Sequence, residues 1–464
     1  MASSLFRVKP VESELGHGEL KRTMGTMALL FFSVGSIIGS GIFVILGVAI
    51  PKAGPAVLLS FLLAAVAALF SALSYAELAS AIPASGSSYS YAYVTLGELV
   101  AWVVGWMLML EYGVSVAAVA VGWGEYLNQF LAAFGITLPD AIAQPPGSGG
   151  VFNVPALIVV LLCTFLLIRG ASESARWNTI MVLLKIGILL FFCAVAFTAF
   201  DGSNLAPFLP LGLAGVTAAA GQVFFSYIGF DAASTAGEEA KNPKRDLPIA
   251  IIGSLVVVTV LYLLVTLAAL GAQNWQLDIG SSSEAVLSTI ADKAVGGSWA
   301  GTLIALGAIV SIFSVVLVTL YGQTRILFAM GRDGLLPKAF TRVSPRTQTP
   351  VFNTVIVGAI IAIPASFVSL GQLAEATSIG TLGAFAVVNV GVIVLRRKHP
   401  DLPRGFKTPL FPLMPILGIL LIVVIVAGLD PVTWLVFAIW MLVGLIVYFS
   451  YSRRHSLLGN SVES

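Results

Sequence analysis

Charged residues are scarce in this sequence of 464 residues, because Asp, Glu, Lys and Arg together account for only 10% of it. Soluble domains carry about 25% of such residues, so the composition excludes a chain that is mostly water-facing. The sequence is instead 58% hydrophobic, with a mean hydropathy of +0.99. These values predict an all-α polytopic membrane protein. The net charge of +2 offers no basic excess for a nucleic acid, and we expect no such partner.

Cysteine and histidine are also rare. The two cysteines, Cys163 and Cys193, fall in apolar runs, which argues against a disulfide framework and favours small core hydrophobes. The three histidines, His17, His399 and His455, lie outside these runs, which excludes a histidine relay or metal site within the membrane. No phosphate-binding loop or nucleophile elbow occurs. We therefore expect neither ATP drive nor covalent catalysis, and the chain is not predicted to be an enzyme.

Twelve apolar runs are each long enough to cross about 30 Å of hydrocarbon. The polar residues before the first run show no cleavage pattern, so the first run itself is expected to direct insertion. Only the letters LGQ separate the ninth run from the tenth. The runs are 27–50, 55–82, 99–132, 151–170, 178–200, 212–237, 249–272, 300–328, 351–370, 373–395, 409–428 and 432–451.

The distribution of basic residues orients these twelve runs. An even number places both termini on one side, and the positive-inside rule makes that side cytoplasmic. Outside lie only Lys52 and Lys293, and Lys185 falls within the fifth run. We therefore expect a multi-pass protein of the plasma membrane, specifically a bacterial inner membrane. The cytoplasmic set is Arg7, Lys9, Lys21, Arg22, Arg169, Arg176, Lys241, Lys244, Arg245, Arg325, Arg332, Lys338, Arg342, Arg346, Arg396, Arg397, Lys398, Arg404, Lys407, Arg453 and Arg454.

The first ten runs divide into two halves of five. An odd number of spans per half inverts the second half relative to the first, and inverted repeats often interrupt helices at matching positions. The predicted organisation is a cytoplasmic segment 1–26, a first repeat 27–200, a second repeat 201–395, two further helices in 396–451 and a cytoplasmic tail 452–464.

The first run of each half contains helix-breaking letters near its middle. The first run holds GSIIGSGIF and the sixth holds GQVFFSYIGFDAASTAGEE. Unwinding at the midplane frees N–H and C=O groups that lipid cannot satisfy, so they must line a cavity in the protein. Helix-start N–H groups suit a carboxylate and freed carbonyls suit an ammonium, so a free amino acid fits a paired break. The alternative for the first run is that Gly35 and Gly39 form a close helix-packing contact.

Both segments resemble helices one and six of the amino acid–polyamine–organocation (APC) transporter superfamily. The segment FFSYIGFDAASTAGEEAKNPKRDLPIAI is similar to the cationic amino acid transporter branch. PASGSSYSYAYVTLGE and TRILFAMGRDGLLP also resemble superfamily segments. The resemblance implies the LeuT-like fold, with twelve transmembrane helices, two inverted five-helix repeats, broken helices one and six, and alternating access.

The resemblance also assigns substrate-binding positions. The substrate carboxylate is expected to meet backbone amides and the α-ammonium to meet backbone carbonyls. The aromatic ring of Phe225 matches a position that covers the substrate from outside, although packing against lipid or core is the alternative. The amides are those of Gly39, Ser40 and Gly41, and the carbonyls are those of Ile37, Phe225 and Ile228.

Lys185 lies about 10 Å deep in an otherwise apolar run. A charge within the membrane is costly and suggests a function, and an ammonium removed from water loses its proton more readily. The resemblance points the same way, because some proton-driven members carry a lysine where sodium-driven members bind the ion. We expect the proton to be the coupling ion, with no sodium site and no other cofactor. The alternatives are a structural ammonium on the broken first helix, or a snorkelling lysine.

Three carboxylates accompany these features. Glu111 is central in the third run and could pair with Lys185, face the substrate side chain, bind a proton, or make a structural hydrogen bond. Asp231 follows the second break and could cap the next half-helix or take part in proton coupling. Glu77 is expected to be structural. The pair Glu238 and Glu239 could form an inner gate with nearby basic residues, or a solvated loop.

The leading hypothesis is a secondary active transporter that imports small neutral L-amino acids, such as alanine, by proton symport. An obligate exchanger and a transporter of arginine or lysine are the alternatives within this class. A channel would show a polar stripe on several helices or a filter loop, and a membrane sensor would carry a soluble domain. The expected partners are the amino acid and the lipid bilayer, and a monomer is sufficient for the function.

Overall fold

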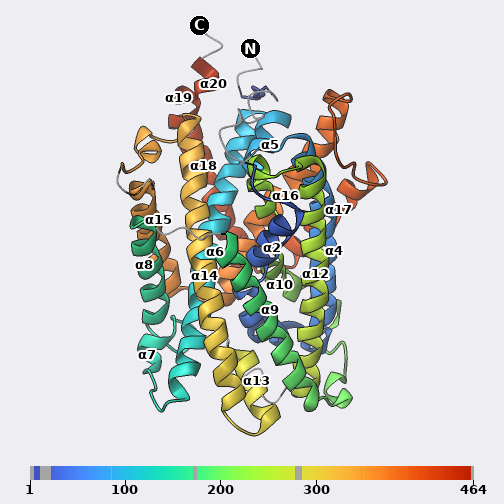
Figure 1. Cartoon of the computed structure of the whole chain (residues 1–464), viewed down its shortest axis with the longest axis vertical. Coiled ribbons are helices and arrows are strands. Elements are labelled where there is room, and N and C mark those ends of the chain that lie inside the picture. The colour runs from blue at the N-terminus through green and yellow to red at the C-terminus, as the bar shows by residue number, and fades with distance from the viewer. Residues whose placement is uncertain are drawn as a thin grey trace.

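The computed structural model describes residues 5–10, 22–84, 86–170, 175–276, 285–345, 347 and 349–460. These residues form an elongated bundle of helices, and both chain ends emerge at the same end of it (Figure 1). Within the described residues, the only β pairing is an isolated bridge between Met24 and Ala240. Of the residues singled out above, His17, Lys21 and Arg346 lie outside the described set.

Helices occupy all twelve predicted apolar runs in the described chain. Two of the runs are broken into shorter pieces, as the glycine-containing letters predict. The helices of the runs are α2 (Thr26–Ile37) with α3 (Ser40–Ala53), α4 (Val57–Ala81), α6 (Glu98–Ala132), α8 (Val154–Ile168), α9 (Ala175–Thr198), α10 (Gly212–Phe224) with η3 (Phe225–Tyr227) and α11 (Ala232–Thr235), α12 (Pro243–Ala272), α14 (Trp299–Arg332), α15 (Val351–Phe367), α16 (Leu370–Lys398), α17 (Leu413–Ala427) and α18 (Pro431–Val447).

Shorter helices connect these elements. Within the described chain, eight helical stretches reach the length and apolarity needed to cross a membrane, and the first of them, Thr26–Ala81, includes α2, α3 and α4. The apolar helices α8, α15 and α17 are shorter. The connecting helices are α5 (Ser87–Thr95), α7 (Asp140–Ala143) and α13 (Val286–Val295), and α19 (Arg453–His455) and α20 (Leu457–Asn460) follow α18.

The boundary between the ninth and tenth runs differs from the prediction. The letters LGQ do not form a connection, because α16 already begins at Leu370, which is fully buried. The turn lies at Val368 and Ser369, both of which have extended backbone. Hydropathy misplaced this turn because Val368 is as apolar as the helices on either side.

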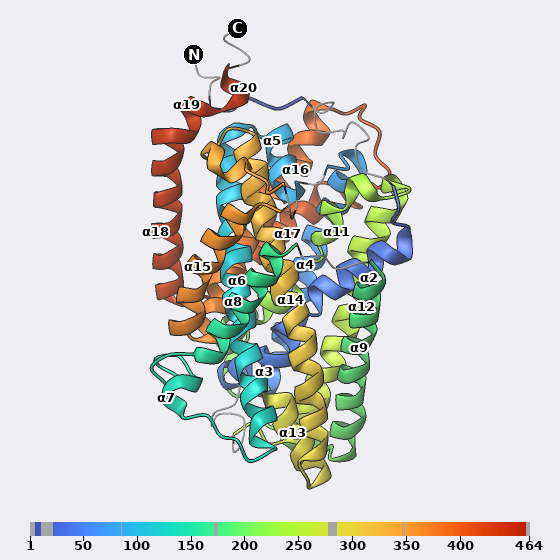
Figure 2. The ribbon, with the colours of Figure 1, turned by 60° about the vertical axis from the view of Figure 1, so that its left-hand side comes forward.

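The helices differ in how much of their surface the protein covers. About 67% of the most apolar window of α6 and of α16 is buried inside the bundle, against 17% for the stretch containing α18. Figure 2 shows α18 along one outer edge of the molecule. A helix that is apolar on all sides and that the other helices leave uncovered is suited to contact with lipid. The α6 helix packs against α14 and α16 at the centre, and α12 packs against α2 and α4.

Glu77 has the structural role that the sequence indicates. Its carboxylate is fully buried near the end of α4. Arg396 donates to it through Nε at 2.7 Å and a second nitrogen at 2.6 Å, Arg404 lies 3.3 Å away, and the backbone N–H of Thr408 donates at 2.8 Å. This network ties the α16–α17 loop to α4. Cys163 and Cys193 are buried free thiols, as expected of core residues.

Candidate substrate site at the two helix breaks

The first break lies at the predicted position. The α2 helix ends at Ile37, Ile38 leaves helical geometry with φ −73° and ψ 74°, and Gly39 follows with φ −101° and ψ −146°. The next helix then starts at Ser40, so the N–H groups of Ser40 and Gly41 have no carbonyl acceptor one turn earlier in the helix. The break therefore provides backbone N–H donors at this point, and such donors can bind an anion.

The second break has a similar form. The α10 helix ends at Phe224, a 3₁₀ turn covers Phe225–Tyr227, and Ile228 is extended with φ −65° and ψ 138°. Gly229 has φ +117°, which L side chains rarely adopt, so glycine is needed here. The chain then resumes as α11 at Ala232.

The two breaks touch each other directly. A β-carbon added to Gly41 would lie 2.5 Å from the Cα of Ser226, and one added to Gly229 would lie 2.7 Å from the carbonyl oxygen of Ser36. Each glycine therefore admits the backbone of the other break at a distance that no side chain would allow. The fold brings together two unwound segments that are almost 190 residues apart in the sequence, and this pairing creates the candidate substrate site.

Some of the freed backbone groups already have partners. The carbonyl of Ile37 accepts the N–H of Gly39 at 2.7 Å and the hydroxyl of Tyr262 at 2.9 Å, so both of its lone pairs are in use. The carbonyl of Phe225 accepts the N–H of Ile228 at 3.4 Å. The predicted ammonium ligands are thus unequal. The carbonyls of Phe225 and Ile228 are more open than that of Ile37.

Lys185 points at the broken first helix. It lies in α9 and is 2% exposed. Its Nζ donates to the carbonyl of Gly35 at 3.0 Å. Gly35 also packs closely against Val182, which lies in α9 like Lys185. The contact is the one expected of an ammonium that stabilises the break. A cation thus sits where unwinding has released a carbonyl oxygen.

Glu111 in α6 and Asp231 at the start of α11 are two carboxyl groups near each other. Both side chains are almost completely buried, and the two carboxyl groups influence each other electrostatically. The hydroxyl of Thr381 is also near the carboxyl group of Glu111. Asp231 occupies the N-cap position of α11 but makes no capping hydrogen bond. Its carboxylate instead accepts from the hydroxyl of Ser87 at 3.3 Å. Asp231 therefore stands at the N-cap position of α11 without capping the helix through its side chain.

The residues around the breaks include one from a distant helix. Gly39 faces the side chain of Val315 in α14, whose Cγ1 would lie 3.1 Å from an added β-carbon. Phe225 is 5% exposed at the start of η3. The hydroxyl of Ser226 is buried and has no hydrogen-bond partner among the described residues, which marks a polar group open to a substrate or water.

Sequence reasoning placed Ser226 in the second break but did not identify Tyr262 or Val315 as parts of this site. Tyr262 stands alone in an apolar run, and a single tyrosine is a weak signal because tyrosines are common in such helices. A further link was also missed. The hydroxyl of Ser33 lies 2.8 Å from that of Ser254 and donates to the carbonyl of Phe230 at 3.2 Å, which joins α2 to α12 and the second break.

Comparisons with known proteins place the chain among membrane permeases and transporters. A family model described as amino acid permease matches residues 24–449. The chain is 46% identical to a methylthioribose transporter of Bacillus subtilis, over 98% of this chain and 99% of that protein. It is 45% identical to a branched-chain amino acid permease of the same organism, over 99% and 100% of the two chains. It is also 38% identical to the vacuolar cationic amino acid transporter 4 of Arabidopsis thaliana, over 86% and 68%.

Proposed function

We propose that this chain, which belongs to the amino acid permease family, imports neutral L-amino acids by proton symport. Membership confirms at the family level the APC resemblance of the sequence motifs, and it makes the chain a membrane transporter rather than an enzyme. The observation that carries the proposal is the direct contact of the two breaks at Gly41 and Gly229. We further propose twelve spans, arranged as two inverted five-helix repeats with two additional helices.

The proposed substrate pose uses the main chain for the part common to all amino acids. The carboxylate meets the N–H groups of Ser40 and Gly41 at the start of α3, where the helix dipole favours an anion. The ammonium meets the carbonyls of Phe225 and Ile228. The carbonyl of Ile37 can accept from the ammonium once the hydroxyl of Tyr262 no longer donates to it. The N–H of Gly39 can donate to the carboxylate once its hydrogen bond to the carbonyl of Ile37 is broken.

A neutral side chain fits the groups around the breaks. Val315 and Phe225 are both apolar and nearly buried, and a small aliphatic side chain such as that of alanine buries favourably against them. The branched-chain permeases among the relatives, at 45% and 36% identity, extend the proposed range to valine, leucine and isoleucine.

A cationic amino acid is the second candidate, and one observation favours it. The Oε2 atom of Glu111 is buried and has no hydrogen-bond partner in the described chain, and such an oxygen suits a guanidinium or ammonium group. The nearby Asp231 carboxyl would strengthen that attraction. Relatives named cationic amino acid transporters are 35% to 39% identical to this chain.

Proton coupling is proposed to run through Lys185. Its ammonium donates to the freed carbonyl of Gly35, so the break is stabilised while the lysine is charged. Loss of the proton would remove that charge-assisted bond and allow α2 to move. Glu111 and Asp231, whose carboxyl groups influence each other, are proposed as further proton-binding groups. In this scheme the ammonium takes the place of a sodium ion.

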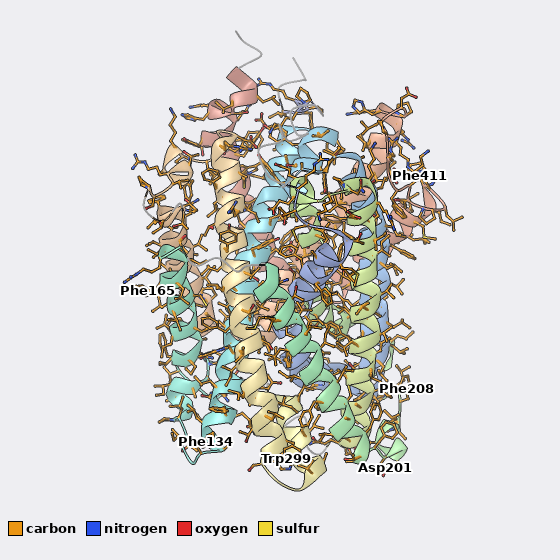
Figure 3. The ribbon with its side chains drawn as sticks, viewed as in Figure 1. Phe134, Phe165, Asp201, Phe208, Trp299 and Phe411 are labelled. Carbon is orange, nitrogen blue, oxygen red and sulfur yellow. The ribbon has the colours of Figure 1, made fainter. Side chains whose placement is uncertain are left out.

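The proposed orientation places both termini in the cytoplasm. Figure 3 shows Phe134, Asp201 and Trp299 at the end opposite the termini, and Lys293 lies in α13 close in sequence to Trp299. The end with the termini carries the basic residues of the α14–α15 and α16–α17 connections. By the positive-inside rule this end faces the cytoplasm. No partner subunit is required by the proposed mechanism.

Uptake into proteoliposomes tests the proposal. The purified protein is reconstituted into empty vesicles, an acidic exterior is imposed, and uptake of labelled alanine, leucine, arginine and methylthioribose is measured. We expect alanine and leucine to accumulate and the pH gradient to be required. Uptake that requires internal amino acid identifies an exchanger, arginine uptake alone favours the cationic candidate, and methylthioribose uptake alone removes the amino acid proposal.

The variant Lys185→Ala tests the coupling step. We expect it to abolish accumulation driven by the pH gradient, because the proton-carrying group is gone. The matched control is Lys293→Ala, an exposed lysine in α13, which should retain accumulation. Unchanged proton-driven accumulation by Lys185→Ala would remove Lys185 as the proton carrier.

A further inference from the structure

Four exposed cations gather at the end of the molecule where both termini lie. Lys241, Lys244 and Arg245 stand at the start of α12, and Lys407 stands in the α16–α17 loop. We call these four residues the basic patch. The loop reaches α12 because Gly405 contacts the backbone of Lys244. Figure 3 marks this loop by Phe411, on the outer flank of the bundle.

The loop that carries Lys407 is held in place on both sides of that residue. The N–H of Phe406 donates to the hydroxyl of Ser80 at 3.1 Å, and the N–H of Thr408 donates to the buried carboxylate of Glu77 at 2.8 Å. Both acceptors belong to α4. The position of Lys407 is therefore fixed by the fold, and the basic patch is assembled before any ligand arrives.

The acidic residues near the patch do not neutralise it. Asp246 accepts hydrogen bonds from the hydroxyl of Thr26 at 2.6 Å and from the N–H of Asn242 at 2.9 Å, and it is buried. Asp401 is the exposed acid of the α16–α17 loop. Glu238 and Glu239, just before Lys241, are half-buried. Four exposed cations thus stand beside one exposed and two half-buried carboxylates, which leaves a smaller excess of positive charge at the surface.

An apolar stripe continues from the patch along α12. Ile249 lies one turn after Arg245 and is 43% exposed, and Val256 and Val260 further along are 51% and 64% exposed. A cluster of cations above an exposed apolar stripe matches the two parts of a phospholipid, the charged headgroup and the acyl chains. A small soluble anion would use only the cations. We propose that the basic patch binds the headgroup of an anionic phospholipid, with an acyl chain along this stripe.

The patch is connected to the first broken helix. The N–H of Lys241 donates to the carbonyl of Met24 at 2.8 Å, and the N–H of Met24 donates to the carbonyl of Glu239 at 3.0 Å. Met24 lies two residues before α2. A lipid held at the patch therefore stabilises the contact between the start of α2 and the start of α12. An effect on transport rests on the proposed function, whereas lipid binding does not.

Thermal unfolding of the purified full chain in detergent tests the proposal. Phosphatidylglycerol is titrated against phosphatidylcholine of the same acyl chains, and the rise in Tm is measured. The patch variant combines Lys244→Gln, Arg245→Gln and Lys407→Gln. The control variant combines Arg332→Gln, Lys338→Gln and Arg454→Gln, three exposed cations that belong to the end of α14, to the turn Lys338–Thr341 and to α19.

We expect phosphatidylglycerol to raise the Tm of the native chain and of the control variant more than phosphatidylcholine does. The patch variant should need roughly 100-fold more phosphatidylglycerol for the same rise, since each basic residue near an anionic lipid surface contributes about five-fold in affinity. A Lys244→Arg, Lys407→Arg variant keeps the charges and should respond as the native chain does, which separates loss of charge from loss of folding.

Three results would overturn the proposal. The first is an equal response to the two lipids, and the second is an equal loss of response in the patch and control variants, which would indicate diffuse attraction. The third is a full response to inorganic phosphate alone, which would identify a soluble anion as the ligand. None of these measurements depends on transport, so a failure of the proposed function leaves this test intact.

Discussion

The substitution Gly41→Ala tests whether the two helix breaks must touch for transport. An added β-carbon would lie 2.5 Å from the Cα and 2.8 Å from the Cβ of Ser226, whereas ordinary contacts begin at 3.4 Å. The backbones of α3 and η3 would therefore have to separate by about 0.9 Å, the difference between the first and last of these distances. Overpacking of this kind typically costs about 1–3 kcal/mol.

The displacement matters more for function than for folding. The N–H groups of Ser40 and Gly41 would move away from the carbonyls of Phe225 and Ile228, and these groups are proposed to hold opposite ends of one substrate. A misplacement of about 1 Å can cost roughly 100-fold in rate. We therefore expect the initial rate of proton-driven alanine or leucine uptake to fall by about 100-fold, while the protein still folds.

The assay combines uptake with thermal unfolding. Gly187→Ala is the matched control, because nothing lies within 4 Å of a β-carbon added at Gly187 in α9, and alanine is favoured over glycine in a helix by about 1 kcal/mol. The control should transport normally and unfold at or above the native Tm. If Gly41→Ala transported at the native rate with an unchanged KM, the reasoning that places the substrate between the breaks would be refuted.

Three further variants test one contact at the site and one buried ion pair toward each end of the bundle. Tyr262→Phe removes the donor to the carbonyl of Ile37, at about 1 kcal/mol for the hydrogen bond, and should change the substrate KM about five-fold in uptake assays. Glu77→Gln leaves Arg396 without its buried counter-charge, which should cost about 3–5 kcal/mol and lower the Tm sharply. Glu375→Gln weakens the ion pair at the opposite end of the bundle, where Lys52 lies 2.6 Å away, and should lower the Tm by less.

Matched controls define what would contradict the expectations for Glu77→Gln and Tyr262→Phe. Asp401→Asn removes an exposed carboxylate and should leave the Tm unchanged. If Glu77→Gln lowered the Tm no more than Asp401→Asn does, the buried ion-pair argument would be contradicted. Tyr451→Phe, in the turn after α18, should leave the KM unchanged. A Tyr262→Phe variant with the native KM would show that the carbonyl of Ile37 takes no part in binding.

Much of the architecture follows from local sequence. A helix in lipid must satisfy its own backbone hydrogen bonds, so runs of apolar letters predict helices without knowledge of their neighbours. The breaks at Gly39 and Gly229 could be predicted for the same reason, since glycine and polar residues weaken a helix locally. The boundary at Val368 could not be predicted, because an apolar residue with extended backbone leaves no trace in hydropathy.

The site residues divide in the same way. Ser40, Gly41, Phe225 and Ile228 could be proposed from the sequence because the family resemblance points to the main chain at a helix break, and the structure places a break at these positions. The neighbours of Glu111 could not be predicted, because Thr381 and Asp231 come near it only in the folded structure. Which carboxylate meets which hydroxyl depends on helix rotation, and the apolar letters around it do not specify that rotation.

The sequence by itself determined that this chain enters a membrane, which runs of the chain are helical, and where two of these helices break. Only the tertiary structure decided which groups meet at those breaks. Lys185 reaches the carbonyl of Gly35 from 150 residues away, and Tyr262 reaches that of Ile37 from 225 residues away. Helix formation is local because each hydrogen bond spans one turn, whereas such contacts depend on how separate helices pack against one another.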